Sequence, residues 1–447
     1  MRSLVHSCKN PRGSVLIVVL IVCTALVSLT LVLGHTMLLA YRGADNEMAG
    51  RQADLAVEGG AQYAESIMSN VAEPGMMPDP TTYQSQEMPL GDATLWFIGE
   101  PLPTDTSNQV VFGLVDEASK LNLNTATAAM LENLPGMTED LAESIVAWRT
   151  SGTSSSTSGS SSASSTSSSS DGSNVKAAPF ESVEELAQVN GGTDLSVLYG
   201  TDTNLNHVLD PEESASGVSS FQPGLMEYLT VFTREPNVMA SGSNRVNVTQ
   251  TTGTLTQLLD TTFGSNRGAA IATAIQRAGP VKSVLEFYMK SGMTAAEFAE
   301  ISPQLTMTKG AYSVGLVNVN SASETVLECI PGITPTMAGQ IVSTRASQAV
   351  TTGSASPNLA WVGPILGGTA AAMAGPYLTA ETFQVTADVA AVGAHGRGYR
   401  RTQFVIDTSN GTPQIVYRRN LSGLGWALGS TERQTLAKNE EKEGQTQ

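Results

Sequence analysis

The chain carries the stretch GSVLIVVLIVCTALVSLTLVLGHTMLLAY at residues 13–41, and no residue from Ser14 to Tyr41 has a formal charge. As a helix that rises ~1.5 Å per residue, this segment would extend roughly 42 Å, more than the ~30 Å hydrocarbon core of a bilayer requires. Lys and Arg, but no acidic residue, precede it, at positions 2, 9 and 12. Because cytoplasmic flanks of membrane helices are rich in Lys and Arg, residues 14–41 are predicted to form a single-pass transmembrane helix with a cytoplasmic N-terminus.

Gly13 stands where the basic segment meets the apolar one. The arrangement resembles that of type IV prepilins, in which a prepilin peptidase removes a short basic leader that ends in Gly. The resemblance implies that residues 1–13 are a leader and that cleavage falls between Gly13 and Ser14. Val18 stands at the fifth mature position, where most pilins carry Glu, and Ser14 stands where they usually carry Phe. An ordinary transmembrane anchor with a chance Gly is the alternative.

The residues behind the anchor predict an α+β fold that is split by an insertion. Small or apolar residues recur every three or four positions at Ala49, Ala53, Ala56, Gly60, Tyr63 and Ile67, which predicts a helix with one closely packed face. Alternating patterns predict strands at 93–98, 109–115, 382–389, 402–407 and 414–418, and these strands are expected to pair in one antiparallel sheet. The expected parts are therefore a helix with the first strands (42–115), a large, mainly helical insertion (116–375), C-terminal strands (376–428) and a polar, disordered tail (429–447).

A repeat marks the insertion. Leu121-Asn122-Leu123-Asn124-Thr125-Ala126 and Val317-Asn318-Val319-Asn320-Ser321-Ala322 open two copies, at 121–149 and 317–345, and a weaker third copy starts at Val246-Asn247-Val248. Each full copy reads as a helix, a Pro-Gly turn and a second helix, and resembles the helix-hairpin-helix unit. The Asn side chains are expected to cap the first helix, and Arg149 and Arg345 to be solvated or to cap helix ends.

The charge of the chain argues against nucleic acid as a partner. The net charge is −17 and the pI about 4.7, whereas binding to phosphates requires Lys and Arg. Acidic residues surround the first hairpin, so the hairpins are predicted to be architectural. No Cys, His or carboxylate residues are spaced as in a zinc site and no catalytic set is apparent, so the chain is not expected to be an enzyme.

The segment 202–213 has the spacing of a calcium loop. It follows a Ser-rich stretch at 151–173, which is expected to be a flexible linker. With Asp202 as position one, oxygen-bearing side chains fall at positions one, three, five, nine and twelve, and the main-chain carbonyl of position seven completes the set. The predicted calcium ligands are Asp202, Asn204, Asn206, Val208, Asp210 and Glu213. His207 occupies position six, which is normally Gly, and a polar turn without metal is the alternative.

Together these features resemble the general secretion pathway protein K family, the minor pseudopilins of type II secretion, in which the Glu at the fifth mature position is usually missing. The resemblance implies a pilin-like head with a helical insertion, at the tip of the pseudopilus. It also implies that the N-terminal helix is anchored in the bacterial inner membrane. It also implies a periplasmic body, and as partners the minor pseudopilins I and J, the major pseudopilin and the prepilin peptidase. Two alternatives remain open: a membrane-anchored DNA-uptake protein, and a tip pilin of a surface appendage.

Overall fold

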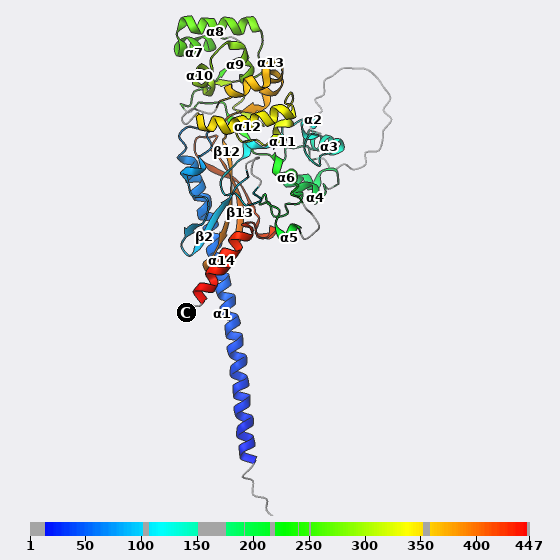
Figure 1. Ribbon diagram of the computed structural model, residues 1–447, viewed down its shortest axis with the longest axis vertical. Helices are drawn as coiled ribbons and strands as arrows, with labels where there is room; N and C mark the ends of the chain where they lie inside the picture. The colour runs from blue at the N-terminus through cyan, green and yellow to red at the C-terminus, as the bar shows by residue number, and fades with distance from the viewer. Residues whose placement is uncertain are drawn as a thin grey trace, which may run out of the picture.

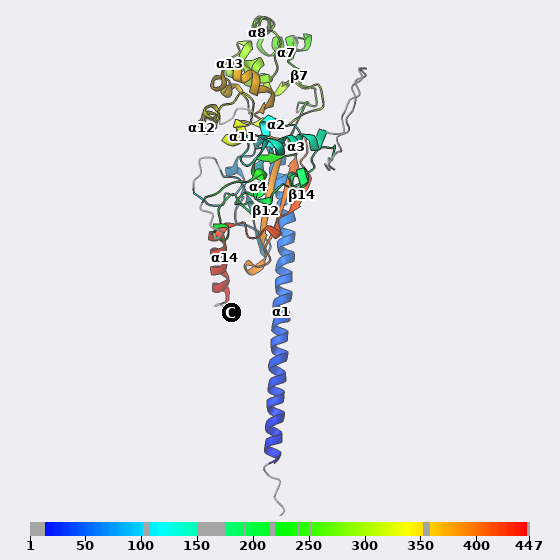
Figure 2. The same cartoon turned by 90° about the vertical axis from the view of Figure 1, so that its right-hand side faces the viewer.

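The computed structural model describes residues 14–101, 107–150, 176–191, 193–214, 220–239, 241–249, 252–351 and 358–444. Its longest element is helix α1 (Ser14–Ser69), whose N-terminal half projects from the head as a bare stalk (Figures 1 and 2). All described side chains from residue 15 to residue 48 are exposed, and the helix is long and apolar enough to cross a membrane. Gly13 and the predicted leader lie outside the described residues.

The C-terminal half of α1 packs against the central sheet through small residues. Ala53, Ala56 and Ala64 are fully buried there. Gly60 permits the closest approach, because a Cβ atom at this position would lie 2.6 Å from Cγ1 of Val389. The predicted face is confirmed from Ala49 to Gly60, which places the helix directly on the middle of the sheet, whereas Tyr63 is exposed and Ile67 only partly buried.

The sheet is antiparallel, with the order β1-β2-β12-β13-β14. Its strands are β1 (Met88–Leu90), β2 (Ala93–Ile98), β12 (Gln384–Val392), β13 (Arg400–Asp407) and β14 (Gln414–Asn420), while β3 (Val115–Asp116) also pairs with β12. Segments from both ends of the chain thus build one sheet, as predicted.

The expected strand at 109–115 is mostly wrong. Two hydrogen bonds, each 2.8 Å long, join this segment to β2 and the residue that follows it. Gly99 N–H donates to the Val111 carbonyl, and Gly113 N–H donates to the Phe97 carbonyl. The segment then continues as β3. Because β12 is longer than β2, β3 completes the same edge of β12 beyond the end of β2.

Between β3 and β12 the described residues form three successive units, where the sequence showed two clear copies and a weak third. Each unit starts with a short strand that contains the repeated Asn and ends with a Leu-Thr strand parallel to it. The pairs are β4 (Leu121–Asn122) with β5 (Leu229–Thr230), β7 (Val246–Asn247) with β8 (Leu305–Thr306), and β10 (Val317–Asn318) with β11 (Leu378–Thr379). Strands β6 (Arg234–Pro236), after the first unit, and β9 (Tyr312–Val314), after the second, pair with each other antiparallel.

Helices fill each unit. The first holds α2 (Ala128–Leu131), α3 (Glu139–Thr150), α4 (Leu195–Tyr199), α5 (Pro211–Ser214), α6 (Leu225–Tyr228) and the 3₁₀ helix η4 (Val183–Gly191). The second holds α7 (Gly253–Phe263), α8 (Ser265–Ala278), α9 (Val284–Ser291) and α10 (Ala295–Ile301), and the third α11 (Glu324–Glu328), α12 (Pro335–Thr351) and α13 (Gly363–Ala374). Helices α7–α10 and α13 lie at the end of the head farthest from the stalk (Figure 1).

The C-terminal segment is not the disordered tail that its polar composition suggested. Residues 429–444 form helix α14, on the stalk side of the head (Figures 1 and 2). Leu436 packs with Trp96, Ala427 and Leu428 in a small apolar cluster. This contact gives the helix an apolar anchor that composition alone does not reveal.

Candidate functional site

The repeated Asn residues fix the opening turn of each hairpin, but they do not cap its first helix. The Asn122 Oδ1 atom accepts the N–H of Asn124 at 2.8 Å, and its Nδ2 donates to Thr233 Oγ1 at 2.8 Å. Asn318 repeats the first contact with Asn320 and donates to Thr382. The N-caps are instead Thr127 for α2 and Ser323 for α11. The expected capping role of Asn is therefore wrong, because a Thr or Ser stands nearer the helix start.

Arg149 and Arg345 close the same turns from the second helix of each hairpin. Arg149 donates to the main-chain carbonyls of Leu123 and Ala126, and Arg345 donates to that of Ala322 at 2.5 Å. Burial lowers the pKa of both guanidinium groups. The prediction that these arginines are solvated or cap helix ends is therefore wrong: each is half-buried and binds main-chain carbonyls within its own unit.

The two Pro-Gly turns differ in what surrounds them. A Cβ atom on Gly332, whose φ is 89°, would lie 2.9 Å from Cβ of Met373, so α13 packs against this side of the second turn. The first turn, at Gly136, is exposed, but Glu132 and Glu139 are exposed beside it. Helical hairpins that bind DNA present free main-chain N–H groups to phosphate. At the second turn, Pro331 is exposed but Gly332 is half-buried against Met373, and the first turn has acidic neighbours that repel a phosphate.

The predicted calcium loop belongs to the first unit of the insertion and lies against the sheet. Asp202, Asn204, Asn206 and Val208 are all buried. The Asp202 carboxylate accepts the N–H of Asn206 at 3.1 Å and that of His207 at 2.7 Å. The loop therefore folds tightly around the side chain of its first position.

The last two predicted side-chain ligands, Asp210 and Glu213, also accept hydrogen bonds from the loop itself. Asp210 Oδ2 accepts from Nδ2 of Asn204 and from Nδ2 of Asn206, each at 2.8 Å. Glu213 accepts the N–H of Thr203 at 2.7 Å and that of Asp210 at 3.1 Å. In the described part of the chain, no three His, Cys, Asp or Glu side chains are gathered as a metal cluster.

His207 adopts the backbone conformation that position six of a calcium loop requires. Its φ is 62°, in the left-handed region where this position normally has Gly. Its ring Nδ1 lies 2.6 Å from Oε2 of Glu227 on α6. Burial disfavours the charged ring, but the Glu227 carboxylate outweighs it and raises the pKa of His207 to about 9. An ion pair thus holds the non-Gly residue in place.

The residues present fit a calcium ion in two further respects. The Asn204 Oδ1 atom is buried and has no hydrogen-bond partner among the described residues, although buried amide oxygens rarely go unpaired. The Asn204 and Asn206 amide nitrogens converge on Asp210, and a half-turn of an Asn side chain exchanges its nitrogen for its oxygen. Hard oxygen donors of this kind are what calcium prefers.

A buried arginine that the sequence did not single out fastens this loop to the sheet. Arg401 of β13 is fully buried and donates to both carboxylate oxygens of Asp388 on β12, at 2.9 and 2.6 Å. It also donates to the carbonyls of Asn204 and, at 2.7 Å, Leu205. One guanidinium thus joins two sheet strands to the loop. The Thr402–Asp407 pattern predicted the strand, but nothing local marked Arg401 as a buried cation.

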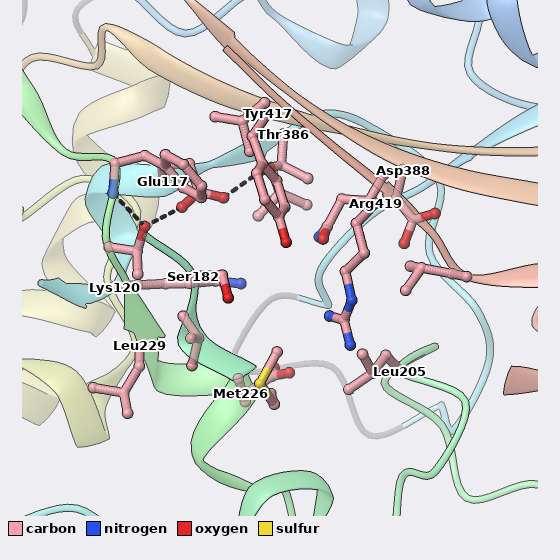
Figure 3. Close-up of a pocket in the computed structure, with 18 of the residues that line it drawn as sticks. Glu117, Lys120, Ser182, Leu205, Met226, Leu229, Thr386, Asp388, Tyr417 and Arg419 are labelled. Carbon is pink, nitrogen blue, oxygen red and sulfur yellow. Dashed lines mark hydrogen bonds between the residues drawn. The ribbon is translucent and has the colours of Figure 1, made fainter. Parts of the chain in front are cut away.

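Next to this contact, a polar cavity of about 70 Å³ lies between the sheet and the insertion (Figure 3). Glu117 reaches into it and accepts hydrogen bonds from the hydroxyl groups of Thr230 and Thr386, which belong to the first unit and to β12. Lys120 and Arg419 also line it. The cavity is small, and the hydrogen bonds of Glu117 in its lining join the insertion to the sheet.

A comparison with known families finds a helix-hairpin-helix motif at residues 116–155. This range contains β4, α2 and α3, the strand and hairpin of the first unit. No curated protein matches the chain closely enough to count as a relative. The match agrees with the predicted hairpin and covers only a small part of the chain.

Proposed function

We propose that the protein is a minor pseudopilin at the tip of a type II secretion pseudopilus, where it assists the export of folded proteins across the outer membrane. The observation that carries this proposal is α1, a single helix with an exposed apolar half and a second half packed on an antiparallel sheet. That combination is similar to a pilin-like head on its anchor. The role is structural and involves no catalysis.

The position of the insertion supports a place at the tip. Helices α7–α10 and α13 lie beyond the sheet, on the side away from the stalk (Figure 1). In a filament built by stacking stalk helices side by side, a subunit above would have to occupy that space. Val18 adds to the argument, because a subunit with no neighbour above does not need a Glu there to pair with a terminal amine.

The same proposal places the chain in its surroundings. Residues 14–41 cross the bacterial inner membrane once, the leader before Ser14 is cytoplasmic until the prepilin peptidase removes it, and the head is periplasmic. The partners are the minor pseudopilins I and J and the major pseudopilin.

Calcium is the proposed structural cofactor. Asp202, Asn204, Asn206, Asp210 and Glu213 would hold it through side-chain oxygens, and Val208 through its carbonyl. Asp210 would then bind the ion instead of the amide N–H groups of Asn204 and Asn206, and the loop would hold the insertion more rigidly against β13. The observation that favours this assignment is the convergence of the Asn204 and Asn206 side-chain amides on Asp210, with the Asn204 oxygen left unpaired in its present orientation.

A gene deletion tests the proposed function. In a host that carries the secretion machinery, loss of this protein should leave folded exported enzymes between the two membranes, and restoring the gene should return them to the medium. Detergent extracts should yield the protein together with smaller pilin-like chains. Normal secretion by the deletion strain would contradict the proposal.

The helix-hairpin-helix match keeps a DNA-uptake protein as the second candidate. If the hairpins are architectural, the head from about residue 46 should not shift duplex DNA at physiological salt. Binding in the micromolar range or tighter, which weakens steeply with added salt, would favour DNA uptake instead. A deletion strain that loses natural transformation but secretes normally would do the same.

A further inference from the structure

The calcium loop has a neighbour outside its own twelve residues. Asn204 Nδ2 donates to Asp210 Oδ2 at 2.8 Å and also to the main-chain carbonyl of Trp426 at 3.1 Å. Trp426 is 222 residues away in the sequence, in the segment that leads into α14. One amide nitrogen is thus shared between a predicted loop ligand and the C-terminal segment.

The loop and the C-terminal segment also line one cavity. A cavity of about 480 Å³ is lined by Asn204, Asp210 and Glu213 of the loop and by Trp426 and Arg433 of the C-terminal segment. Three of the predicted ligand residues therefore face the same space as Trp426.

A bound cation changes which group can serve the Trp426 carbonyl. For Asn204 to bind calcium, its oxygen must point where its nitrogen now lies, since that is the side that faces Asp210. Its present Oδ1 position has no hydrogen-bond partner, so the half-turn breaks no bond there and brings the amide nitrogen to that buried position. After this half-turn, the Asn204 oxygen, the Asp210 carboxylate and the Trp426 carbonyl would be three acceptors around one point. Three acceptors repel one another unless a cation lies among them.

The distances suit such an arrangement. Oxygens bound to one calcium ion at 2.3–2.6 Å lie roughly 3 to 4 Å from each other. An oxygen in the present place of Asn204 Nδ2 would be about that far from both Asp210 Oδ2 and the Trp426 carbonyl, which now lie 2.8 and 3.1 Å away. Calcium binds six to eight oxygens, and the loop offers ligands from six residues.

We propose that the main-chain carbonyl of Trp426 is a calcium ligand, so that bound calcium ties the C-terminal segment and α14 to the insertion. This inference rests on the proposed calcium loop. The ion would then join three parts that are distant in sequence: the first unit, β13 through Arg401, and the C-terminal segment.

Hydrogen exchange followed by mass spectrometry tests the proposal on the full-length protein in detergent micelles. Calcium binding is measured first, by titration of CaCl₂ into metal-free protein. Exchange of peptides from 424–436 is then compared with and without saturating calcium. If Trp426 is a ligand, calcium should slow exchange in these peptides several-fold.

Two variants sharpen the result. Asn204→Asp keeps an oxygen ligand but cannot donate to Trp426, so its segment should exchange faster than wild type without calcium and regain protection with it. Glu212→Gln removes the exposed ion pair to Arg433 and no predicted ligand, and should keep the calcium-dependent protection. Calcium that binds but leaves exchange at 424–436 unchanged, or makes it faster, would overturn the role of Trp426 and leave the calcium loop in place. Absence of calcium binding would overturn both.

Discussion

Replacement of Arg401 by Leu should destabilise the head more than the loss of an exposed ion pair does. Arg401 is fully buried, and its guanidinium pairs with both oxygens of Asp388 while it donates to two carbonyls of the loop. Without it, Asp388 keeps a buried charge without its partner, and the Asn204 and Leu205 carbonyls lose a donor.

The expected cost follows from these contacts. Removal of one partner of a buried ion pair costs about 3–5 kcal/mol, because the other charge remains buried. Each buried acceptor left without a donor adds about 1–3 kcal/mol where water cannot reach it. We therefore expect a loss of at least about 3 kcal/mol in the free energy of unfolding.

Urea unfolding of the head from about residue 46, followed by circular dichroism, measures this loss. Arg418→Leu is the matched control, because the Arg418–Glu58 pair is about half exposed and such pairs contribute about 0–1 kcal/mol. The double variant Arg401→Leu, Asp388→Asn should recover part of the loss, since it removes the unpaired charge. Equal urea midpoints for Arg401→Leu and Arg418→Leu would refute the reasoning.

Three other predictions concern the loop, a buried carboxyl and α1. Chelation should lower the melting temperature of the head and calcium should restore it, since a ligand at a hundred times its Kd adds about 2.7 kcal/mol to the free energy of unfolding. Glu213→Gln should lose this response, while Glu212→Gln should keep it. Burial raises the pKa of Asp116 to about 6 from 3.8, so the folded chain binds its proton more tightly than the unfolded chain, and stability from this group falls as pH rises from about 4 to 6. Asp116→Asn should therefore flatten that part of a plot of urea midpoint against pH, and an unchanged slope would contradict the assignment. Gly60→Leu should cost about 1–3 kcal/mol, because even its Cβ would lie 2.6 Å from Val389; an unchanged melting curve would mean that α1 does not sit on the sheet in this way.

Local patterns in the sequence were sufficient for α1 and for the strands at both ends of the chain. Helical spacing of small residues located the packed face of α1, and alternation located β2, β12, β13 and β14. The signal in α1 reflects burial of one helix face, whereas β12 is buried at every position and most of β14 is exposed, so alternation located these strands without describing their burial. The strand at 109–115 failed because its length is set by the end of β2, which the segment itself does not encode.

The insertion shows what local patterns miss. The opening Asn of each unit was found, but the closing Leu-Thr strands at 229–230, 305–306 and 378–379 were not, since two residues carry little signal until their parallel partners are known. The roles of Arg149 and Arg401 depend on carbonyls 26 and 197 residues away, respectively. Contacts over such separations come from the folded topology.

The measurement that tests the central claim most directly is N-terminal sequencing of the protein extracted from membranes of a host with an active prepilin peptidase. The account predicts that the chain starts at Ser14. Gly13→Ala should leave the leader attached and abolish secretion, while Gly34→Ala, at an exposed position of α1 with no neighbour within 4 Å, should be processed normally. A chain that starts at Met1 beside an active peptidase would contradict the proposal that this protein is a pseudopilin.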